Sequence, residues 1–285
     1  TNNAALSAQN SISRTQSSLS TSMTRLSTGY RINSAMDDAA GLQIASRLKS
    51  QTSGMAVAMR NTQNSTSMLQ TAEGALDEVG NMLVRMKDLA TQSADASSTA
   101  KDKEAMQSEY DALGLELKNV LQNTTFGGTK LLVGTANDGT LRAGAMTFQI
   151  GASSSETMSV NLSTAISQVV SDVSSASVNY SSTTTGSELT AGTNANTTIG
   201  KLETALASVN KVRSDLGAAA NRLEHVYNNL SNISTNSKAA TGLIMDVDFA
   251  SESANMTSNQ MLLQAGTAML KQSNSMSSMV MSLLQ

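Results

Sequence analysis

The hydrophobic positions near the C-terminus recur with a seven-residue period. Leu262, Met269, Met276 and Leu283 form one series. A second series, interrupted by Ser277, runs beside it at Met256, Leu263, Leu270 and Leu284. Such heptads place an apolar seam along one side of a helix. After Glu252 the only charged residue is Lys271. An isolated helix of this kind is marginal in water, so it needs partners.

The first residues of the chain repeat this pattern, with Arg14 as the only charge from residue 1 to 24. One interpretation is a pair of ordinary surface helices, but these usually present a charged outer face. The near absence of charge favours helices that are buried on most sides by packing between copies of the chain. We therefore predict that the two ends pair, and that they form an assembly seam of Ile12, Leu19, Leu26, Leu262, Leu263, Met269, Leu270, Met276, Leu283 and Leu284.

The helical pattern breaks near Gly29 and resumes as a long helix from about 42 to 94, which would extend roughly 80 Å. Before it, Asn33 or Ser34 offers an N-cap, and Ser34 with Asp37 fits a capping box. The alternative for the Asp37-Asp38 pair is metal binding, but no third ligand lies nearby in the sequence. The long helix carries a clear apolar stripe at Leu69, Ala72, Leu76, Val79, Leu83, Met86 and Ala90.

Two further helices should pack on this stripe. Residues 93–101 indicate a turn, and a helix follows with an apolar face that includes Tyr110 and Leu117. The two should fold back as an antiparallel hairpin. A third stripe covers 199–233, which predicts a three-helix bundle. This helix should end near residue 233, and Gly242 then marks a break. The carboxylates of Asp246, Asp248 and Glu252 then suit the start of the last helix, since the ligand spacing of a calcium loop is absent.

A small β region follows residue 123, where the period changes from helical to alternating. Gly127-Gly128 and 137–139 are turn signals. Alternating apolar residues predict two short strands, at Met146, Phe148 and Ile150 and at Met158, Val160 and Leu162. Residues 163–198 are rich in Ser, Thr, Ala, Asn and Gly, and indicate an exposed, variable surface segment with a short helix near 166–173.

The composition supports a mainly α fold: a long antiparallel helical bundle or coiled coil with a small β-hairpin region and paired N- and C-terminal helices. The 285 residues include no Pro, Trp or Cys, and aromatic residues make up 2%. Absence of proline permits long uninterrupted helices. Absence of cysteine excludes disulfides and leaves the compartment open.

Charge and hydropathy exclude several partners. A net charge of -3 without a Lys/Arg cluster does not favour nucleic acid. No stretch approaches the ~20 apolar residues of a membrane span, so we expect no membrane insertion. The N-terminal residues do not resemble a cleavable signal peptide. A secreted chain would therefore leave by a route that reads no such signal.

The sequence contains no catalytic constellation, and we expect no enzyme activity, no cofactor and no metal. His225 is the only histidine, and the Glu224-His225 pair lacks the second histidine of a zinc-protease helix. His225 lies between apolar positions of a helical pattern, which indicates a residue at the edge of the bundle. There is no cysteine nucleophile and no glycine-rich phosphate loop.

Residues 26–42, LSTGYRINSAMDDAAGL, are similar to the segment LSSGLRINSAKDDAAGL of the bacterial flagellin family. Further segments that resemble the family in order are 71–76, 89–94, 121–128, 213–218, 264–270 and the closing Leu283-Leu284. A departure occurs at 242–244, where Gly-Leu-Ile stands in place of the family's usual Ser-Arg-Ile. A basic contact made there in relatives is therefore in doubt.

The resemblance implies a structural subunit of the extracellular flagellar filament, a homopolymer. It implies an inner domain of 1–37 plus 241–285, a surrounding domain of 38–162 plus 197–240, and a short variable segment at 163–196. It also implies unfolded export through the flagellar type III apparatus, assembly beneath the cap, and contact with hook-associated proteins. The methionines of 245–281 suit an export chaperone at the C-terminal helix, or simply a core.

The resemblance further implies recognition by Toll-like receptor 5. Arg85, Leu89 and Glu109 match the positions recognised in relatives, whereas Lys87 and Asp88 are conservative departures. Arg85 offers a planar fork to a partner, and we expect Leu89 beside it on the helix surface. The alternative is that these residues only contact neighbouring subunits; both interpretations can hold for a subunit that exists free and assembled.

The alternatives to a filament subunit are a hook–filament junction protein, which shares the terminal helices, and another secreted coiled-coil structural protein. The terminal stripes also predict a mechanism. In the free chain both ends should be largely disordered, because their seam has no partner, and in the polymer they should fold together.

Overall fold

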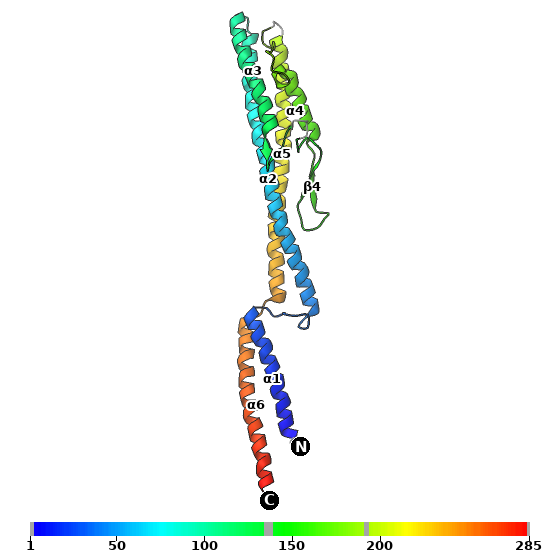
Figure 1. Cartoon of the computed structure of the whole chain (residues 1–285), viewed down its shortest axis with the longest axis vertical. Coiled ribbons are helices and arrows are strands. Elements are labelled where there is room, and N and C mark those ends of the chain that lie inside the picture. Colours follow the sequence, from blue (N-terminus) through cyan, green and yellow to red (C-terminus); the bar gives the residue numbers. More distant parts are fainter. Residues whose placement is uncertain (1–2, 134–138, 191–193, 284–285) are drawn as a thin grey trace. The chain divides into compact units, whose positions relative to one another are not determined.

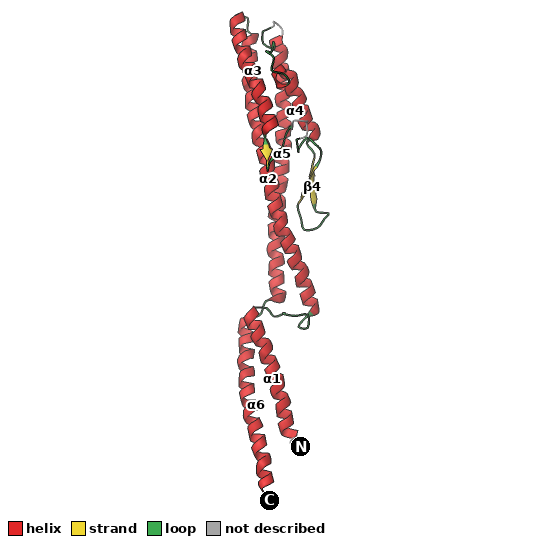
Figure 2. Ribbon diagram, viewed as in Figure 1, coloured by secondary structure: helices red, strands yellow, loops and turns green. Residues whose placement is uncertain are grey.

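The computed structural model describes residues 3–133, 139–190 and 194–283, and the side chains of these as far as residue 276 (Figure 1). Its helices are α1 (Asn3–Thr28), α2 (Ala39–Ala94), α3 (Ala100–Asn123), α4 (Ser163–Ala176), the 3-10 turn η1 (Val178–Tyr180), α5 (Asn194–Met245) and α6 (Phe249–Leu283). Its strands are β1 (Thr125–Phe126), β2 (Thr129–Lys130), β3 (Met146–Gln149) and β4 (Thr157–Val160). Helix dominates, with strands confined to two small hairpins (Figure 2), so the predicted mainly α class is confirmed.

The chain packs as two compact units. The terminal unit is Thr1–Ser53 with Ile233–Gln285, and the bundle unit is Gly54–Asn232. The chain therefore passes from one unit to the other between residues 53 and 54 and again between residues 232 and 233. The domain boundaries inferred from family resemblance, at 37/38, 162/163, 196/197 and 240/241, stay a prediction about the assembled protein.

The core of the bundle unit forms where α2, α3 and α5 bring their apolar stripes together. Leu76, Leu117 and Leu216 are each at most 1% exposed. Ion pairs border this core: Lys87 Nζ lies 2.8 Å from Glu203 Oε1, and Arg213 Nη2 lies 2.8 Å from Asp77 Oδ1. The three predicted stripes are therefore confirmed as one core.

The predicted turn between α2 and α3 is also confirmed. Thr99 caps α3, because its hydroxyl accepts from the Asp102 amide and the Asp102 carboxylate accepts from Thr99 in return. The Thr99 hydroxyl and amide lower the pKa of Asp102. Since a lowered pKa keeps the carboxylate charged, this cap remains intact until the pH falls through that lowered pKa.

The β region follows the predicted alternation. β3 and β4 pair antiparallel with Phe148 opposite Met158, and both side chains are buried. β1 and β2 form a hairpin whose two-residue loop is Gly127-Gly128, with φ of 58° and 83°. Positive φ at both positions is the requirement of a type I′ turn, which explains the glycine pair. Of the second predicted turn, 137 and 138 lie outside the described residues.

The prediction that residues 163–198 form an exposed segment is wrong for its apolar residues, which are buried. Ile166, Val169 and Val173 of α4 are at most 2% exposed and belong to the core, as do Tyr180 and Leu189. The short predicted helix is confirmed and is longer than expected. The apolar residues recur at helical spacing, but an overall composition dominated by Ser and Thr concealed the periodicity.

Two predicted helix ends are displaced. The Asp38 carboxylate accepts from the Gly41 amide at 2.9 Å and caps α2, so neither Asn33 nor Ser34 is its cap. At the other boundary, α5 continues through Gly242 to Met245. A single glycine costs a helix only about 1 kcal/mol, which packing overrides.

None of the helices in the described part of the chain is long and apolar enough to cross a membrane.

Candidate assembly surface

The terminal unit is built on the antiparallel packing of α1 against α6 (Figure 1). The described side chains that face this seam are half-buried: Ile12, Leu19 and Leu26 on α1, and Leu263 and Leu270 on α6. Gly266 lets the helices approach closely, because a Cβ there would lie 2.9 Å from Ile12 Cγ1. A two-helix unit leaves the outer side of each helix uncovered.

Of the ten positions predicted as one seam, the eight whose side chains the structure describes lie on two different sides. Leu263 and Leu270 face α1, whereas Leu262, Met269 and Met276 are 57%, 69% and 55% exposed. Consecutive residues on a helix are about 100° apart, so adjacent heptad series cannot share one face. Leu283 belongs to α6, but its side chain and the whole of Leu284 lie outside what the structure describes. We define Leu262, Met269 and Met276 as the exposed stripe.

The exposed stripe borders a groove of about 470 Å³ between α1 and α6. The groove is lined by small and apolar side chains, including Ala4, Ala8, Ala265, Gly266, Leu262 and Met269. No lining residue is charged. This surface therefore suits an apolar partner and lacks the groups that acid–base or metal chemistry requires.

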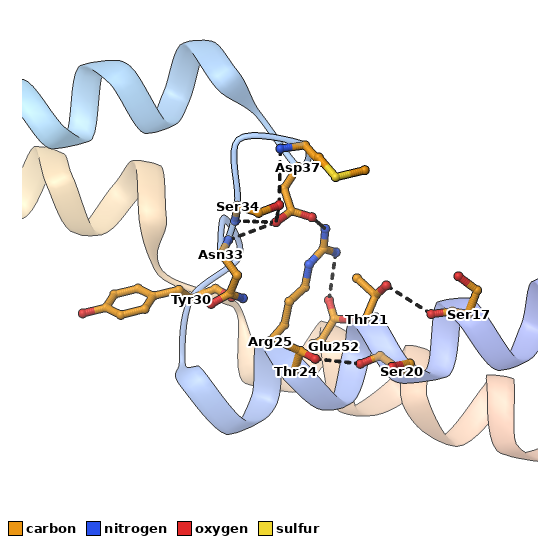
Figure 3. A network of polar contacts seen from close by, with 11 residues as sticks. Ser17, Ser20, Thr21, Thr24, Arg25, Tyr30, Asn33, Ser34, Asp37 and Glu252 are labelled. Carbon is orange, nitrogen blue, oxygen red and sulfur yellow. Dashed lines mark hydrogen bonds and ion pairs between the residues drawn. The ribbon is translucent and has the colours of Figure 1, made fainter.

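The junction between α1 and α6 is held by polar contacts (Figure 3). Arg25 lies between two carboxylates, 4.0 Å from Asp37 and 3.8 Å from the buried Glu252. The amide of Ser34, followed by that of Asn33, lowers the pKa of Asp37 by donating hydrogen bonds to its carboxylate. The lowered pKa keeps Asp37 charged to a lower pH than an ordinary aspartate, and Arg25 ties α1 to α6 and to the 29–38 segment.

Backbone contacts complete the junction. The Arg31 amide donates to the Met245 carbonyl at 2.6 Å, and the Val247 amide donates to the Gly29 carbonyl at 3.0 Å. Gly29 has a φ of 75°, which other residues rarely adopt. Asp248 then caps α6 by accepting from the Ala250 amide, so the predicted helix start at these carboxylates is confirmed.

Two protein-family models match this chain, one in its N-terminal half and one in its C-terminal part. The model of the bacterial flagellin N-terminal helical region matches residues 1–137, and that of the C-terminal helical region matches 199–284. The chain belongs to the bacterial flagellin family. It is 33% identical to Flagellin A of Vibrio anguillarum, over 100% of this chain and 98% of that protein. It is 38% identical to a flagellin of Halalkalibacterium halodurans, over 92% and 90% of the two chains.

Flagellins are structural proteins, and this chain is a structural subunit of the flagellar filament and not an enzyme. As a member of this family it polymerises with copies of itself. A solved structure of a putative flagellar hook-associated protein from Vibrio parahaemolyticus resembles it with a TM-score of 0.55 at 17% identity. That match covers 73% of this chain and 99% of the other, and it shows likeness of fold alone.

The residues proposed for receptor contact in this flagellin fall into two environments. Arg85 and Glu109 are 56% and 46% exposed and form an ion pair between α2 and α3, with Nη2 to Oε1 at 2.7 Å. Leu89 is only 3% exposed and belongs to the core, so the expectation that it lies on the helix surface is wrong. The apolar stripe of α2 is wide enough to bury Met86, Leu89 and Ala90 together, which a narrow stripe of one residue per turn did not predict.

Proposed function

We propose that the terminal unit is the assembly surface of this filament subunit, and that the exposed stripe is covered by neighbouring copies. The observation that carries the proposal is a set of large apolar side chains left open on a helix pair with almost no charge. Burying a Leu or Met side chain completely contributes about 1.5–3 kcal/mol. For three side chains that are 55–69% exposed, covering them would contribute roughly 3–5 kcal/mol per copy.

We further propose that the terminal helices become fully ordered only in the polymer. In α1 the one fully buried residue is Ser22, so none of its apolar side chains is buried completely. The bundle unit, by contrast, has a continuous core. An isolated helical hairpin with a half-buried seam gains too little to offset the conformational entropy of ordering some sixty residues. Packing against further copies would supply the difference.

Seeded polymerisation tests the proposed assembly surface. Purified full-length chain, added to short filament fragments of the same protein, should elongate them into filaments visible by electron microscopy. Chain from which α6 has been removed by limited proteolysis should not elongate the seeds. Elongation by both preparations would contradict a role for the terminal unit.

We propose a receptor contact that uses Arg85 and Glu109 without Leu89. The support is their exposure on adjacent helices, where a partner reaches the guanidinium and the carboxylate together. In this proposal Arg85→Ala lowers activation of cells that express Toll-like receptor 5. Unchanged activation at matched monomer concentration would remove the receptor contact and leave the ion pair as a local bundle contact.

The remaining partners stay predictions that rest on family resemblance. These are export through the type III apparatus, an extracellular location, the cap and hook-associated proteins, and an export chaperone. One structural feature supports the chaperone: α6 presents Met261, Met269 and Met276, whose flexible thioether side chains adapt to varied apolar partners.

A further inference from the structure

The terminal unit carries an exposed patch with two large apolar side chains as well as a groove. Leu243, in the last turn of α5, is 87% exposed, and Tyr30 is 48% exposed. Tyr30 lies across from Asp246 in an isolated antiparallel bridge. Asp246 follows Leu243 by three residues, and its amide donates to the Gly242 carbonyl, so the two share one turn. We define Tyr30, Leu243 and Asp246 as the junction patch.

The junction patch is held in place although its side chains are open to solvent. Arg31 anchors the segment beside it, with its amide on the Met245 carbonyl and its guanidinium 2.9 Å from the Ile244 carbonyl. In Figure 3 the Tyr30 ring points away from the Arg25 network. The contacts of Arg31 hold the segment of Tyr30 against the end of α5, so the exposed leucine and tyrosine can meet one partner surface together.

The groove and the junction patch complement one another in charge, and both present apolar side chains. The groove has a volume of about 470 Å³ and is mainly apolar, with the hydroxyl groups of Ser7, Ser11 and Thr15 along its α1 side. Arg14 stands at the rim of the groove, two helical turns after the lining residue Ser7, and is exposed. Within the described residues neither Arg14 nor Asp246 has an ion-pair partner.

We infer that the junction patch of one copy docks into the α1–α6 groove of a neighbouring copy, with Asp246 facing Arg14. This inference rests on the proposed function and names the surface that covers part of the exposed stripe. The two complementary surfaces differ and lie on the same chain. Such a heterologous contact closes into a ring or continues as an open helical polymer, and a filament requires the second.

The contact also sets how neighbouring copies are offset. The groove is centred near residue 10 of α1, and the junction patch begins at residue 30. At 1.5 Å per residue, twenty residues separate them by roughly 30 Å along the helix axis. Copies joined in this way are therefore displaced axially by about that distance.

A charge swap tests the contact in the full-length protein. Arg14→Glu and Asp246→Arg should each raise the critical concentration for polymerisation about fivefold, because like charges then meet at every contact. The double variant Arg14→Glu/Asp246→Arg should return close to the wild-type value. An equimolar mixture of the two single variants should also polymerise better than either one alone, since opposite charges then meet across unlike copies.

Lys271→Glu is the matched control. It makes the same change of charge on α6, but residue 271 lies nine residues after Leu262, two and a half turns, and so on the opposite side from the groove. It should leave the critical concentration within about twofold of wild type. If Lys271→Glu raises the critical concentration as much as Arg14→Glu does, or if the double variant gives no rescue, the two charges do not act through one contact and the docking is overturned.

Apolar variants separate this contact from the broader proposal. Leu243→Ser should raise the critical concentration about tenfold by removing the docking side chain, and Ala265→Leu should do so by filling the groove. Circular dichroism of the monomers should be unchanged, because both positions are exposed. Normal polymerisation of both variants would overturn the docking and leave the terminal unit as assembly surface. Failure of the wild-type chain to extend seeds would instead overturn the proposed function.

Discussion

Replacing Leu270 by Asp should stop filament growth at concentrations where the wild-type chain polymerises. Leu270 faces α1 in the seam, next to the position where Gly266 brings the helices close. A carboxylate there loses the apolar contact and adds an unpaired charge, at a cost of about 3 kcal/mol or more. That cost raises the critical concentration by a factor of 100 or more, measured by sedimentation of the polymer.

The bundle unit provides the internal reference for this variant. Its core of α2, α3 and α5 contains no part of α6, so its thermal unfolding should be unchanged by Leu270→Asp. Leu270→Met keeps an apolar side chain of similar volume and should polymerise almost as wild type does. Filaments formed by the Asp variant at the normal concentration would show that the seam does not carry assembly.

Replacing Leu89 by Ala should lower the free energy of unfolding of the bundle unit by about 3 kcal/mol. Leu89 is 3% exposed in the core, and removing a buried leucine side chain costs roughly 2–5 kcal/mol because a cavity remains. In a domain of this size the melting temperature should fall by roughly 5–10 °C. Thermal unfolding followed by circular dichroism at 222 nm measures the change.

Arg85→Ala is the matched comparison four residues away. The Arg85–Glu109 pair is about half exposed on both sides, and exposed ion pairs contribute only about 0–1 kcal/mol. Its melting temperature should therefore stay within a few degrees of wild type. A receptor response lost in Leu89→Ala would follow from instability of the unit, whereas a loss in Arg85→Ala would report a contact. If both variants lowered the melting temperature equally, the difference in burial between Leu89 and Arg85 would not determine stability, and the prediction would be wrong.

The periodicity of apolar residues predicted the helices and the main core. Leu76, Leu83 and Tyr110 stand in regular stripes on chain free of proline, and each is buried as expected. The glycine pair at 127–128 similarly indicated a tight turn, because φ above zero is sterically restricted for other residues. At these positions the local sequence pattern and the tertiary packing favour the same structure.

Other features depend on which neighbour a face meets, and periodicity alone does not state that. Leu262 and Leu263 both fit a heptad, but only packing against α1 shows that Leu263 faces inward and Leu262 outward. Leu89 matches a position recognised in relatives. Its burial follows from the width of the α2 face that packs in the core, which the family match does not show. The α4 core residues were concealed because Ser and Thr dominate that segment.

The capping residues illustrate a finer limit. Asp37 and Asp38 are adjacent carboxylates, and each could serve the start of α2. The structure divides the roles: Asp37 holds the 33–34 amides and pairs with Arg25, and Asp38 caps the helix. The pairing with Arg25 could not be predicted from the capping pattern, because Arg25 lies close only where α1 ends beside this segment.

Amide hydrogen exchange of the full-length chain, compared between monomer and filament, tests most directly the idea that the terminal helices are completed by other copies. Peptides from α1 and α6 should exchange within seconds in the monomer and become protected by several orders of magnitude in the filament. Peptides from the α2 and α5 core should be protected in both. Equal and strong protection of α1 and α6 in the monomer would show that the terminal unit is complete without neighbours, and would contradict the account.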